Sequence, residues 1–214
     1  MIRRVEVSKS LRTLEENFTK QLERFYNYLN SLQKIDIATL GPQGTSSEAT
    51  GAYLLSLINK ESASCSIYPS YERAMNSVLS GISDLLLIAN AYYKIDKAYM
   101  CPRLKLLTSF EYATPCYGLA KRIDCQLPKE RPWKIATHHA PSSLVPHFLE
   151  NLENHALQDY EITLVESTSK AAIDTQRGNV DLCITNSNSV QAYNLQFISA
   201  TRPITMVWSV FGRG

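Results

Sequence analysis

The chain has 214 residues, of which 44% are apolar and 20% are charged. This composition is typical of a folded globular protein and excludes a disordered chain, and the length suffices for one large or two small domains. The net charge of +2 and the pI near 8.2 disfavour a nucleic-acid-binding protein, because such proteins carry a basic stripe along the bound phosphates. A small dianionic ligand is compatible with this balance.

Three features of the sequence bear on the cellular location and on bound metals or cofactors: the cysteines, the histidines and the N-terminal residues. The cysteines are odd in number and form no C-x-x-C pair, which disfavours a disulfide framework and a zinc cluster. His138 and His139 are adjacent rather than spaced along one helix face, and there is no phosphate-binding or dinucleotide-binding glycine motif. No apolar run approaches the length of a membrane span or of a signal sequence. We therefore expect a soluble cytoplasmic protein without metal, cofactor, nucleic-acid or membrane partner.

Residues 1–34 are predicted to form an N-terminal amphipathic helix. Apolar residues recur at spacings of three and four on one stripe, namely Leu11, Leu14, Phe18, Leu22, Phe25, Leu29 and Leu32. This stripe needs a cover, which is either the protein's own domain or the helix of a second copy in a homodimer. The sequence leaves both arrangements open.

Residues 41–48 form a predicted tight loop between an apolar strand at 35–40 and a helix at 49–58. Thr45 and Glu48 have the spacing of a capping box, in which each side chain receives an amide at the helix start. Glycines allow close backbone approach, and free amides at a helix N-terminus attract an anion. We expect a carboxylate at this loop, although a plain capped turn has the same pattern.

An internal repeat organises the rest of the chain. A predicted helix at 70–80 leads into the apolar strand at 85–89, and a second helix from Ser167 leads in the same way into residues 182–186. The matching pairs are Ser70 and Ser167, Ala74 and Ala171, Gly81 and Gly178, and Asp84 and Asp181. Strands at 35–40, 133–137 and 162–165 complete two blocks of alternating strands and helices, which predicts parallel α/β units.

Two similar α/β blocks predict two lobes with a cleft between them. We assign residues 35–113 and 187–214 to lobe 1 and residues 114–186 to lobe 2. The chain is expected to cross between the lobes near residues 114–118, and the strand-like segment 205–211 could return to lobe 1. A cleft between lobes is the usual place for a small-ligand site.

Small hydroxyl groups cluster at three predicted helix starts, where hydroxyls and free amides can hold anionic oxygens. They are Thr45, Ser46 and Ser47; Ser142 and Ser143 after Pro141; and Ser167, Thr168 and Ser169. Each group alone could be a helix cap, but three groups in one cleft favour a ligand site. His138 follows the strand at 133–137 and can exchange a proton near neutral pH.

Two stretches resemble the catalytic domain of prephenate dehydratases. Residues 37–48 (IATLGPQGTSSE) are similar to its opening signature, and residues 166–171 (ESTSKA) to its second ligand-binding loop. The resemblance implies an α/β, two-lobed, periplasmic-binding-protein-like (type II) fold that binds prephenate in its cleft. Gly44, Asn90 and Thr114 are further expected substrate contacts, although Asn90 opens residues 90–93 (NAYY), where the chain departs from the Glu-Asn-Ser segment of the dehydratases.

Other stretches depart from the dehydratases and point to a related family. Dehydratases carry a Thr-Arg-Phe motif, whose threonine protonates the departing ring hydroxyl, where this chain has Met206, Val207 and Trp208. Residues 99–107 (YMCPRLKLL), 114–120 (TPCYGLA) and 206–214 (MVWSVFGRG) instead resemble the non-aromatising prephenate decarboxylases of bacilysin, salinosporamide and aeruginosin biosynthesis. This resemblance covers residues 35–214 and leaves the N-terminal helix outside.

The resemblance implies a carbon–carbon lyase that converts prephenate to dihydro-4-hydroxyphenylpyruvate in secondary metabolism. The hydroxyl clusters at 45–47 and 167–169 would hold the pyruvyl arm, and Tyr117, Met206 and Trp208 would form an apolar wall around the ring. His138 is the first candidate for the proton donor, with Tyr92, Tyr117 or an ordered water as alternatives. A prephenate dehydratase that forms phenylpyruvate and a non-catalytic small-acid binding module remain as alternative functions.

Overall fold

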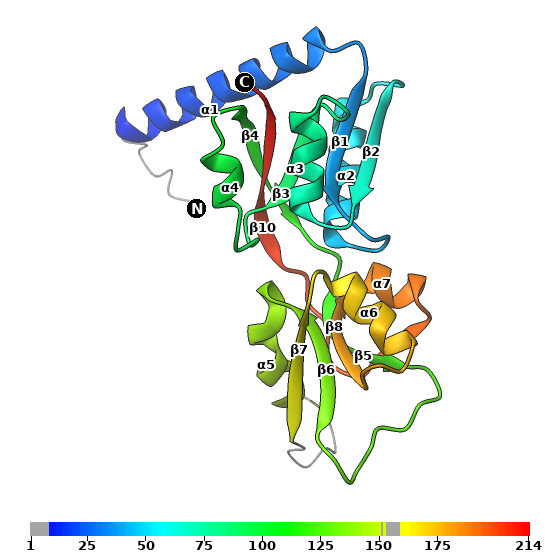
Figure 1. Ribbon diagram of the computed structural model, residues 1–214. Coiled ribbons are helices and arrows are strands. Elements are labelled where there is room, and N and C mark those ends of the chain that lie inside the picture. The colour runs from blue at the N-terminus through cyan, green and yellow to red at the C-terminus, as the bar shows by residue number, and fades with distance from the viewer. Residues whose placement is uncertain (1–8, 151, 153–158) are drawn as a thin grey trace.

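The protein consists of two α/β lobes joined by two crossing segments (Figure 1). The computed structural model describes residues 9–150, 152 and 159–214, so residues 1–8 of the expected N-terminal helix lie outside the described part. Lobe 1 is built on the sheet β2-β1-β3-β10-β4, and lobe 2 is built on the sheet β7-β6-β8-β5-β9. The expected α/β fold with two lobes and an additional N-terminal helix is confirmed.

The elements alternate between strands and helices along the chain. The first part comprises α1 (Lys9–Ser31), β1 (Ile35–Leu40), α2 (Ser46–Ile58), β2 (Ala63–Tyr68), α3 (Tyr71–Leu79), β3 (Leu85–Ala89), α4 (Asp96–Tyr99) and β4 (Leu104–Ala113). The second part comprises β5 (Tyr117–Arg122), β6 (Trp133–His138), the 3₁₀ helix η1 (Ala140–Leu144), α5 (Val145–Glu150), β7 (Tyr160–Val165), α6 (Thr168–Gln176), β8 (Leu182–Asn186), α7 (Ser187–Ala192), β9 (Leu195–Phe197) and β10 (Thr205–Arg213).

The central strands are buried because helices cover both faces of each sheet. In lobe 1, α1 and α2 pack on one face of the sheet, while α3 and α4 pack on the other. Consecutive residues of β3 alternate between these two cores, with Leu85 and Leu87 in the first and Leu86 and Ile88 in the second. A strand buried on both faces is continuously apolar, which is why the run at 85–89 could be recognised from the sequence.

The predicted internal repeat is confirmed first at the ends of two helices. Ser70 caps α3 by accepting the N–H of Arg73 at 3.2 Å, and Ser167 caps α6 by accepting the N–H of Lys170 at 3.0 Å. After each helix the chain turns at a glycine with positive φ, +81° at Gly81 and +79° at Gly178, a conformation that L side chains rarely adopt.

The repeat extends to the aspartate that follows each glycine. The N–H of Asp84 donates to the Asp36 carbonyl oxygen at 2.9 Å, and its carboxylate accepts the Asp36 N–H at 2.9 Å. Asp181 makes the same pair of bonds with the backbone of Lys134, also at 2.9 Å. The strands β1 and β3 of lobe 1 therefore correspond to β6 and β8 of lobe 2.

The chain passes between the two lobes at two adjacent places. After β4, the chain crosses through residues 114–116 into β5, and it returns through residues 198–204 into β10, which pairs with β3 and β4. Lobe 2 extends further than expected, because β9 pairs with β5 in the second sheet. The segment containing Leu195–Phe197, expected in lobe 1, thus lies in lobe 2, and the return crossing comes after it.

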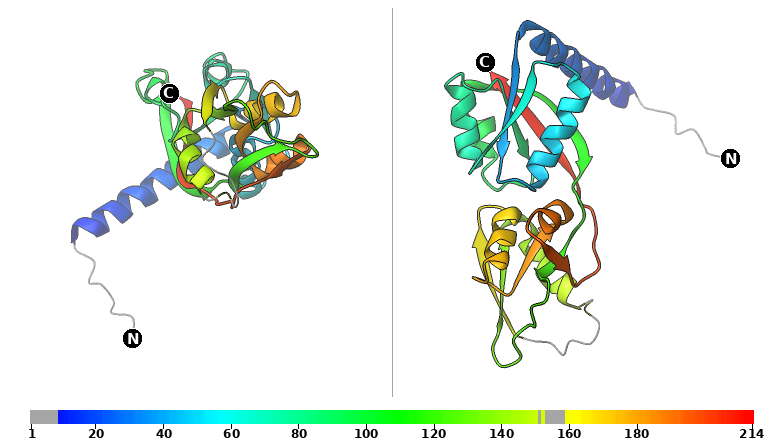
Figure 2. Two further views of the ribbon diagram at one scale, coloured as in Figure 1. Left: turned by 90° about the horizontal axis from the view of Figure 1, so that it is seen from below. Right: turned by 90° about the vertical axis from the view of Figure 1, so that its right-hand side faces the viewer.

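Helix α1 is docked on lobe 1 through one end. Near its C-terminal end, Phe25 and Leu29 are buried in the core of lobe 1. Nearer its N-terminus, Leu11, Leu14 and Phe18 are exposed, and both views of Figure 2 show the helix extending away from the lobe. The single stripe seen in the sequence is therefore covered by the protein's own domain over part of its length. None of the helices in the described part of the chain combines the length and the apolar character of a membrane span.

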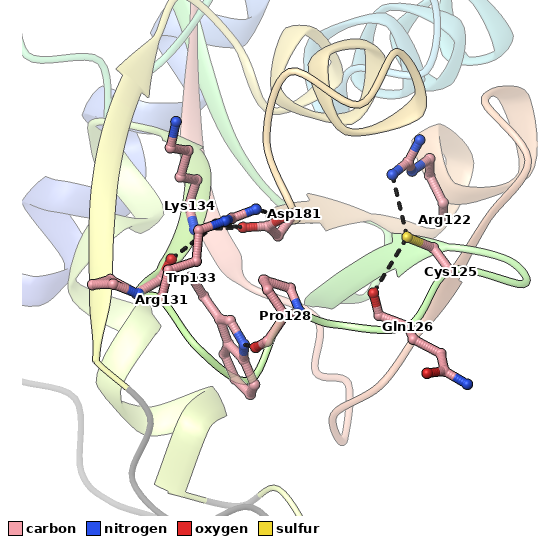
Figure 3. Close-up of polar contacts among 9 residues, drawn as sticks. Arg122, Cys125, Gln126, Pro128, Arg131, Trp133, Lys134 and Asp181 are labelled. Atoms are coloured by element: carbon pink, nitrogen blue, oxygen red, sulfur yellow. Dashed lines mark hydrogen bonds and ion pairs between the residues drawn. The ribbon is translucent and has the colours of Figure 1, made fainter.

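The end of lobe 2 remote from the cleft is held by polar contacts around the amino ends of β6 and β8 (Figure 3). Arg131 forms a bidentate ion pair with Asp181, with N–O distances of 2.7 and 2.8 Å. The indole N–H of Trp133 donates to the Pro128 carbonyl oxygen at 2.9 Å. These bonds fix the connection between β5 and β6, so that β6 reaches the cleft at a defined position.

Candidate active site

A cleft of about 270 Å³ lies between the lobes, where the carboxyl ends of β1, β3 and β6 meet the starts of α2 and α6. Ligands of open α/β sheets bind at this edge of the strands. The volume suits a small organic molecule rather than a macromolecule. Among the described residues, no group of three His, Cys, Asp or Glu side chains is placed to hold a metal ion.

The starts of α2 and α6 bring backbone amides into the cleft wall. The Thr45 hydroxyl accepts the N–H of Glu48 at 3.2 Å, and Ser167 makes the equivalent bond in α6. Within the described structure, the backbone amides of Ser46 and Ser47, which lie between the Thr45 cap and Glu48, have no acceptor. The first turn of a helix carries such unpaired donors and the positive end of the helix dipole. The cleft can therefore bind a carboxylate or a keto oxygen between the two helix starts.

Gly44 lies behind the cleft wall and connects the two lobes. Its φ is +87°, and its carbonyl oxygen accepts the Ser189 hydroxyl of α7 at 3.0 Å. Its own N–H donates to Glu48 at 2.6 Å, so this amide is not available to a ligand. Nearby, the Tyr193 hydroxyl donates to the Gln43 carbonyl oxygen at 2.8 Å. The loop at 41–48 is thus held against α7 of the opposite lobe.

A second connection between the lobes involves a phenol inside the cleft. The Ser46 hydroxyl lies 2.9 Å from the Tyr117 hydroxyl, and it accepts the side-chain amide N–H of Asn186 at 3.3 Å. The Asn186 side-chain oxygen accepts the N–H of Ser189 at 3.0 Å and so caps α7. Because all of these groups are buried, the phenol of Tyr117 is held in one position.

His138 lies at the end of β6 and lines the cleft. Its Nδ1 accepts the N–H of Ala140 at 3.3 Å, which leaves Nε2 to carry the proton of the neutral ring. Burial, together with the neighbouring His139, lowers the pKa of His138 below its ordinary value. The ring is therefore mainly neutral at neutral pH, and its protonated form is a stronger acid than a free imidazolium.

The two tyrosines of lobe 1 that face the cleft are weak acids. The Tyr92 hydroxyl donates to Glu72 at 2.9 Å, and burial followed by this bond raises the pKa of Tyr92. Burial raises the pKa of Tyr71 to about 12, and its hydroxyl lies 2.7 Å from that of Ser47. Glu72 is itself paired with Lys97 at 3.5 Å. Both phenols are suited to hold neighbouring groups rather than to release a proton.

The apolar wall comes from β10. Met206 and Trp208 line the cleft, and Trp208 is 1% exposed because its other side belongs to the core of lobe 1. Val207 lies between them and is 41% exposed, as the alternation of side chains along a strand requires. The stretch 206–208 thus presents two large apolar side chains and no hydroxyl to a ligand.

Most of the predicted site residues are brought together. Those from lobe 1 that line the cleft are Thr45, Ser46, Ser47, Tyr92, Met206 and Trp208, and those from lobe 2 are Tyr117, His138, Pro141, Ser143, Ser167 and Thr168.

Five predicted residues, Gly44 among them, do not line the cleft. Asn90 bonds to Ser209 at 2.7 Å on the other side of the strand. Thr114 accepts the Ile204 N–H at 3.0 Å in the crossing segments. Ser142 donates to the His139 carbonyl oxygen at 2.7 Å, within a 3₁₀ turn that has no side-chain cap. Ser169 faces Ser189 at 2.6 Å behind the start of α6.

Sequence reasoning missed three residues at the site. Tyr71 and Arg202 line the cleft, and Asn186 holds Ser46 from behind. Asn186 ends the predicted strand at 182–186, so the rule that ligands bind at the carboxyl ends of strands could have identified it. Arg202 lies outside every predicted strand and helix, and its place follows only from the pairing of the two crossing segments.

No family model matches the chain, whereas curated proteins and solved structures do. The chain is 37% identical over 177 residues to a prephenate decarboxylase of Planktothrix agardhii, covering 82% of this chain and 86% of that protein. It is 34% identical over 191 residues to a prephenate decarboxylase of Bacillus subtilis, covering 86% of this chain and 90% of that protein.

Two solved structures share the fold. The prephenate dehydratase of Arthrobacter aurescens, in complex with L-Phe, aligns with a TM-score of 0.61 at 16% identity, over 84% of this chain and 61% of that longer chain. A periplasmic substrate-binding protein of an ABC transporter from Coxiella burnetii aligns with a TM-score of 0.53 at 13% identity, over 81% of this chain and 83% of that chain.

Proposed function

The chain belongs to the prephenate decarboxylase family, and we propose that its cleft removes CO2 from prephenate while the ring stays non-aromatic and keeps its hydroxyl. The protein is accordingly a carboxy-lyase. The observation that carries the non-aromatic outcome is the wall of Met206 and Trp208, which offers no acid to the ring hydroxyl.

The start of α2, with its unpaired amides, and the start of α6, with the hydroxyls around both, hold the pyruvyl arm of prephenate. Fixing this arm fixes the ring against Tyr117, Met206 and Trp208, so positioning supplies part of the rate enhancement. A departing carboxylate that faces apolar side chains loses hydration, which favours the charge-dispersed transition state.

The electron pair of the broken C1–CO2 bond forms a new double bond from C1 to an adjacent ring carbon. The electrons of the former ring double bond take up a proton at its far carbon, and the C4 hydroxyl stays in place. Protonated His138 delivers this proton in our proposal, because it is the strongest acid that lines the cleft. The alternative donor Tyr92 is disfavoured by its bond to Glu72 and its raised pKa. The product is a dihydro-4-hydroxyphenylpyruvate, which we place in secondary metabolism.

Incubation of the purified protein with prephenate tests this function. A ketoacid lighter than prephenate by CO2, with no aromatic absorbance before acid treatment, is the expected product. Immediate formation of phenylpyruvate would identify a dehydratase, and recovery of unchanged prephenate at protein concentrations that bind it would identify a binding module. Mass spectrometry and ultraviolet spectra distinguish the three outcomes.

The change Met206→Thr tests the absence of an acid at the ring hydroxyl. We expect the variant to form the non-aromatic ketoacid with phenylpyruvate as a minor product at most, because the added threonine restores only one member of the Thr-Arg-Phe motif of the dehydratases. Met206→Leu, which keeps the wall apolar, should give no phenylpyruvate. Abundant phenylpyruvate from Met206→Thr would show instead that one hydroxyl suffices to redirect the reaction. The product ratio from chromatography decides the result.

We further propose that α1 pairs with α1 of a second copy. The exposed fractions of Leu11, Leu14 and Phe18 are 50%, 62% and 48%, and an apolar groove of about 270 Å³ lies between α1 and α2. A two-fold antiparallel pair centred on Phe18 would bury these exposed side chains between the two copies.

This pairing predicts that Leu14→Glu weakens the dimer by ~100-fold or more, because each copy loses the burial of a leucine and gains a desolvated charge. Lys20→Glu, on the opposite face of the helix, should leave the dimer intact. Light scattering across a dilution series gives the mass. A monomeric wild type, or a Leu14→Glu variant that keeps the dimer mass, would contradict the pairing.

The thiols suggest where the enzyme works. All five cysteines are free in the structure. We propose a cytoplasmic location, where thiols stay reduced.

A further inference from the structure

Arg202 supplies the positive charge of the cleft. Among the described residues that line the cleft, it is the one arginine or lysine, and no aspartate or glutamate accompanies it. The pKa of His138 is lowered, so the imidazole adds little charge at neutral pH. Arg202 also forms no ion pair with any described carboxylate. The residue is exposed and can reach a ligand in the cleft that it lines.

The backbone around Arg202 is fixed by the crossing of the two segments. Its N–H donates to the Tyr117 carbonyl oxygen at 2.9 Å, and its carbonyl oxygen accepts the Tyr117 N–H at 2.7 Å. Pro203 follows, and a residue before proline is kept out of the helical region of conformational space. Arg202 is therefore held beside Tyr117, the residue whose hydroxyl meets Ser46 on the start of α2.

Arg202 is also the outermost member of a row along the cleft. Ile204, Met206 and Trp208 line the same cleft at every second position, as side chains of an extended segment do. Trp208 is buried, Met206 and Ile204 are half-buried, and Arg202 is exposed. The row therefore runs from an apolar interior to a cationic mouth, and this polarity orients an anion that carries an apolar ring.

We propose, on the basis of the function proposed above, that Arg202 binds the pyruvyl carboxylate of prephenate and not the ring carboxylate. A cation on the departing carboxylate would stabilise the substrate more than the transition state, because the charge leaves that group as CO2 forms, and such binding slows the reaction. A cation on the pyruvyl carboxylate stabilises the bound substrate and the transition state equally, and it therefore lowers KM. Arg202 thus selects ring acids that carry a second anionic arm.

The test compares Arg202→Gln and Arg202→Lys with Arg103→Gln, which removes the same charge from an exposed site outside the cleft. For Arg202→Gln we expect KM for prephenate to rise about 10- to 100-fold with kcat nearly unchanged, the range for loss of a charged hydrogen bond. Arg202→Lys should recover part of this loss, since it keeps the charge without the planar fork. Arg103→Gln should match the wild type.

Phenylpyruvate separates the two carboxylates because it has the pyruvyl arm and no ring carboxylate. We expect its Kd, measured by calorimetry, to rise in Arg202→Gln by about the same factor as KM for prephenate. An unchanged Kd, or a rise in KM with a rise in kcat, would place Arg202 on the ring carboxylate and overturn the proposal. Unchanged KM and Kd would overturn it as well. If the wild type did not decarboxylate prephenate, the proposed function would fail, while the calorimetry would still decide whether Arg202 binds the arm.

Discussion

His138→Asn is expected to lower kcat for prephenate decarboxylation by about 10²- to 10⁴-fold, the usual contribution of a general acid. Asparagine retains an oxygen close to the position of Nδ1, which accepts the Ala140 N–H at 3.3 Å in the wild type. The local turn is therefore preserved while the titrating group is lost. Stopped-flow or steady-state measurement of CO2 release gives the rate.

His139→Asn is the matched control, because His139 contacts Tyr93, with ring centroids 5.1 Å apart, and does not line the cleft. Its kcat should stay within a few-fold of the wild type. If His138→Asn keeps near-normal turnover, with protonation on the same ring face, His138 is not the donor. A large loss in Tyr117→Phe would then identify the phenol held by Ser46.

The pH profile gives a second readout of the same assignment. The donor is the protonated form of His138, and burial with the neighbouring His139 lowers the pKa of this group. Its protonated fraction is therefore small at pH 7 and grows as the pH falls, so kcat/KM should rise below neutral pH and level off beneath the lowered pKa. This rise should be absent in His138→Asn. A wild-type profile that falls over the same range would contradict the assignment.

Gly44→Ala is expected to have the second large effect, on both stability and activity. A Cβ at this position would lie 2.9 Å from the Ser189 hydroxyl oxygen and 3.1 Å from the Ser189 Cα. Besides about 1 to 2 kcal/mol for the positive φ, the contact with backbone adds ~1 to 3 kcal/mol of overpacking. The loop at 41–48 must then move away from α7, and a shift of this kind at a substrate-positioning group costs ~100-fold in kcat/KM.

Gly178→Ala provides the comparison, because its φ is +79° but its Cβ would meet only the flexible end of Arg122 at 2.9 Å. The free energy of unfolding of Gly178→Ala should fall only by the cost of the positive φ, and the variant should keep its activity. Urea unfolding and steady-state kinetics on both variants separate the two contributions. Equal losses of stability, with full activity in Gly44→Ala, would show that the contact between the loop and α7 does not position the site.

The fold could be predicted from local patterns because the two lobes repeat them. The caps Ser70 and Ser167, and the glycines after each helix, are short-range signals that need no tertiary context. The buried strands were visible as continuous apolar runs. The extent of lobe 2 was not predictable, because β9 is only three residues long and joins its sheet through long-range pairing with β5.

The site was predictable to the level of helix starts and strand ends but not of side-chain direction. Asn90 follows the buried strand as expected, yet it faces Ser209, while Ala89 and Ala91 line the cleft. Asn90 and Ala91 lie in a turn that is closed by the bond from the Tyr92 N–H to the Ala89 carbonyl oxygen at 2.9 Å, and this turn sets their directions. Ser169 is turned away from the cleft because each residue of a helix is rotated by about 100° from the one before it. Neither direction can be set before the register of the sheet is known.

The pairing of the two crossing segments places the charge of the cleft where the lobes are joined. Thr114 bonds to Ile204 and Tyr117 bonds to Arg202 through their backbones. A swing of one lobe relative to the other that kept these bonds would have its axis here. Such a swing would move Arg202 less than the starts of α2 and α6, which belong to different lobes, so the cleft would keep its charge in place while its amides separate.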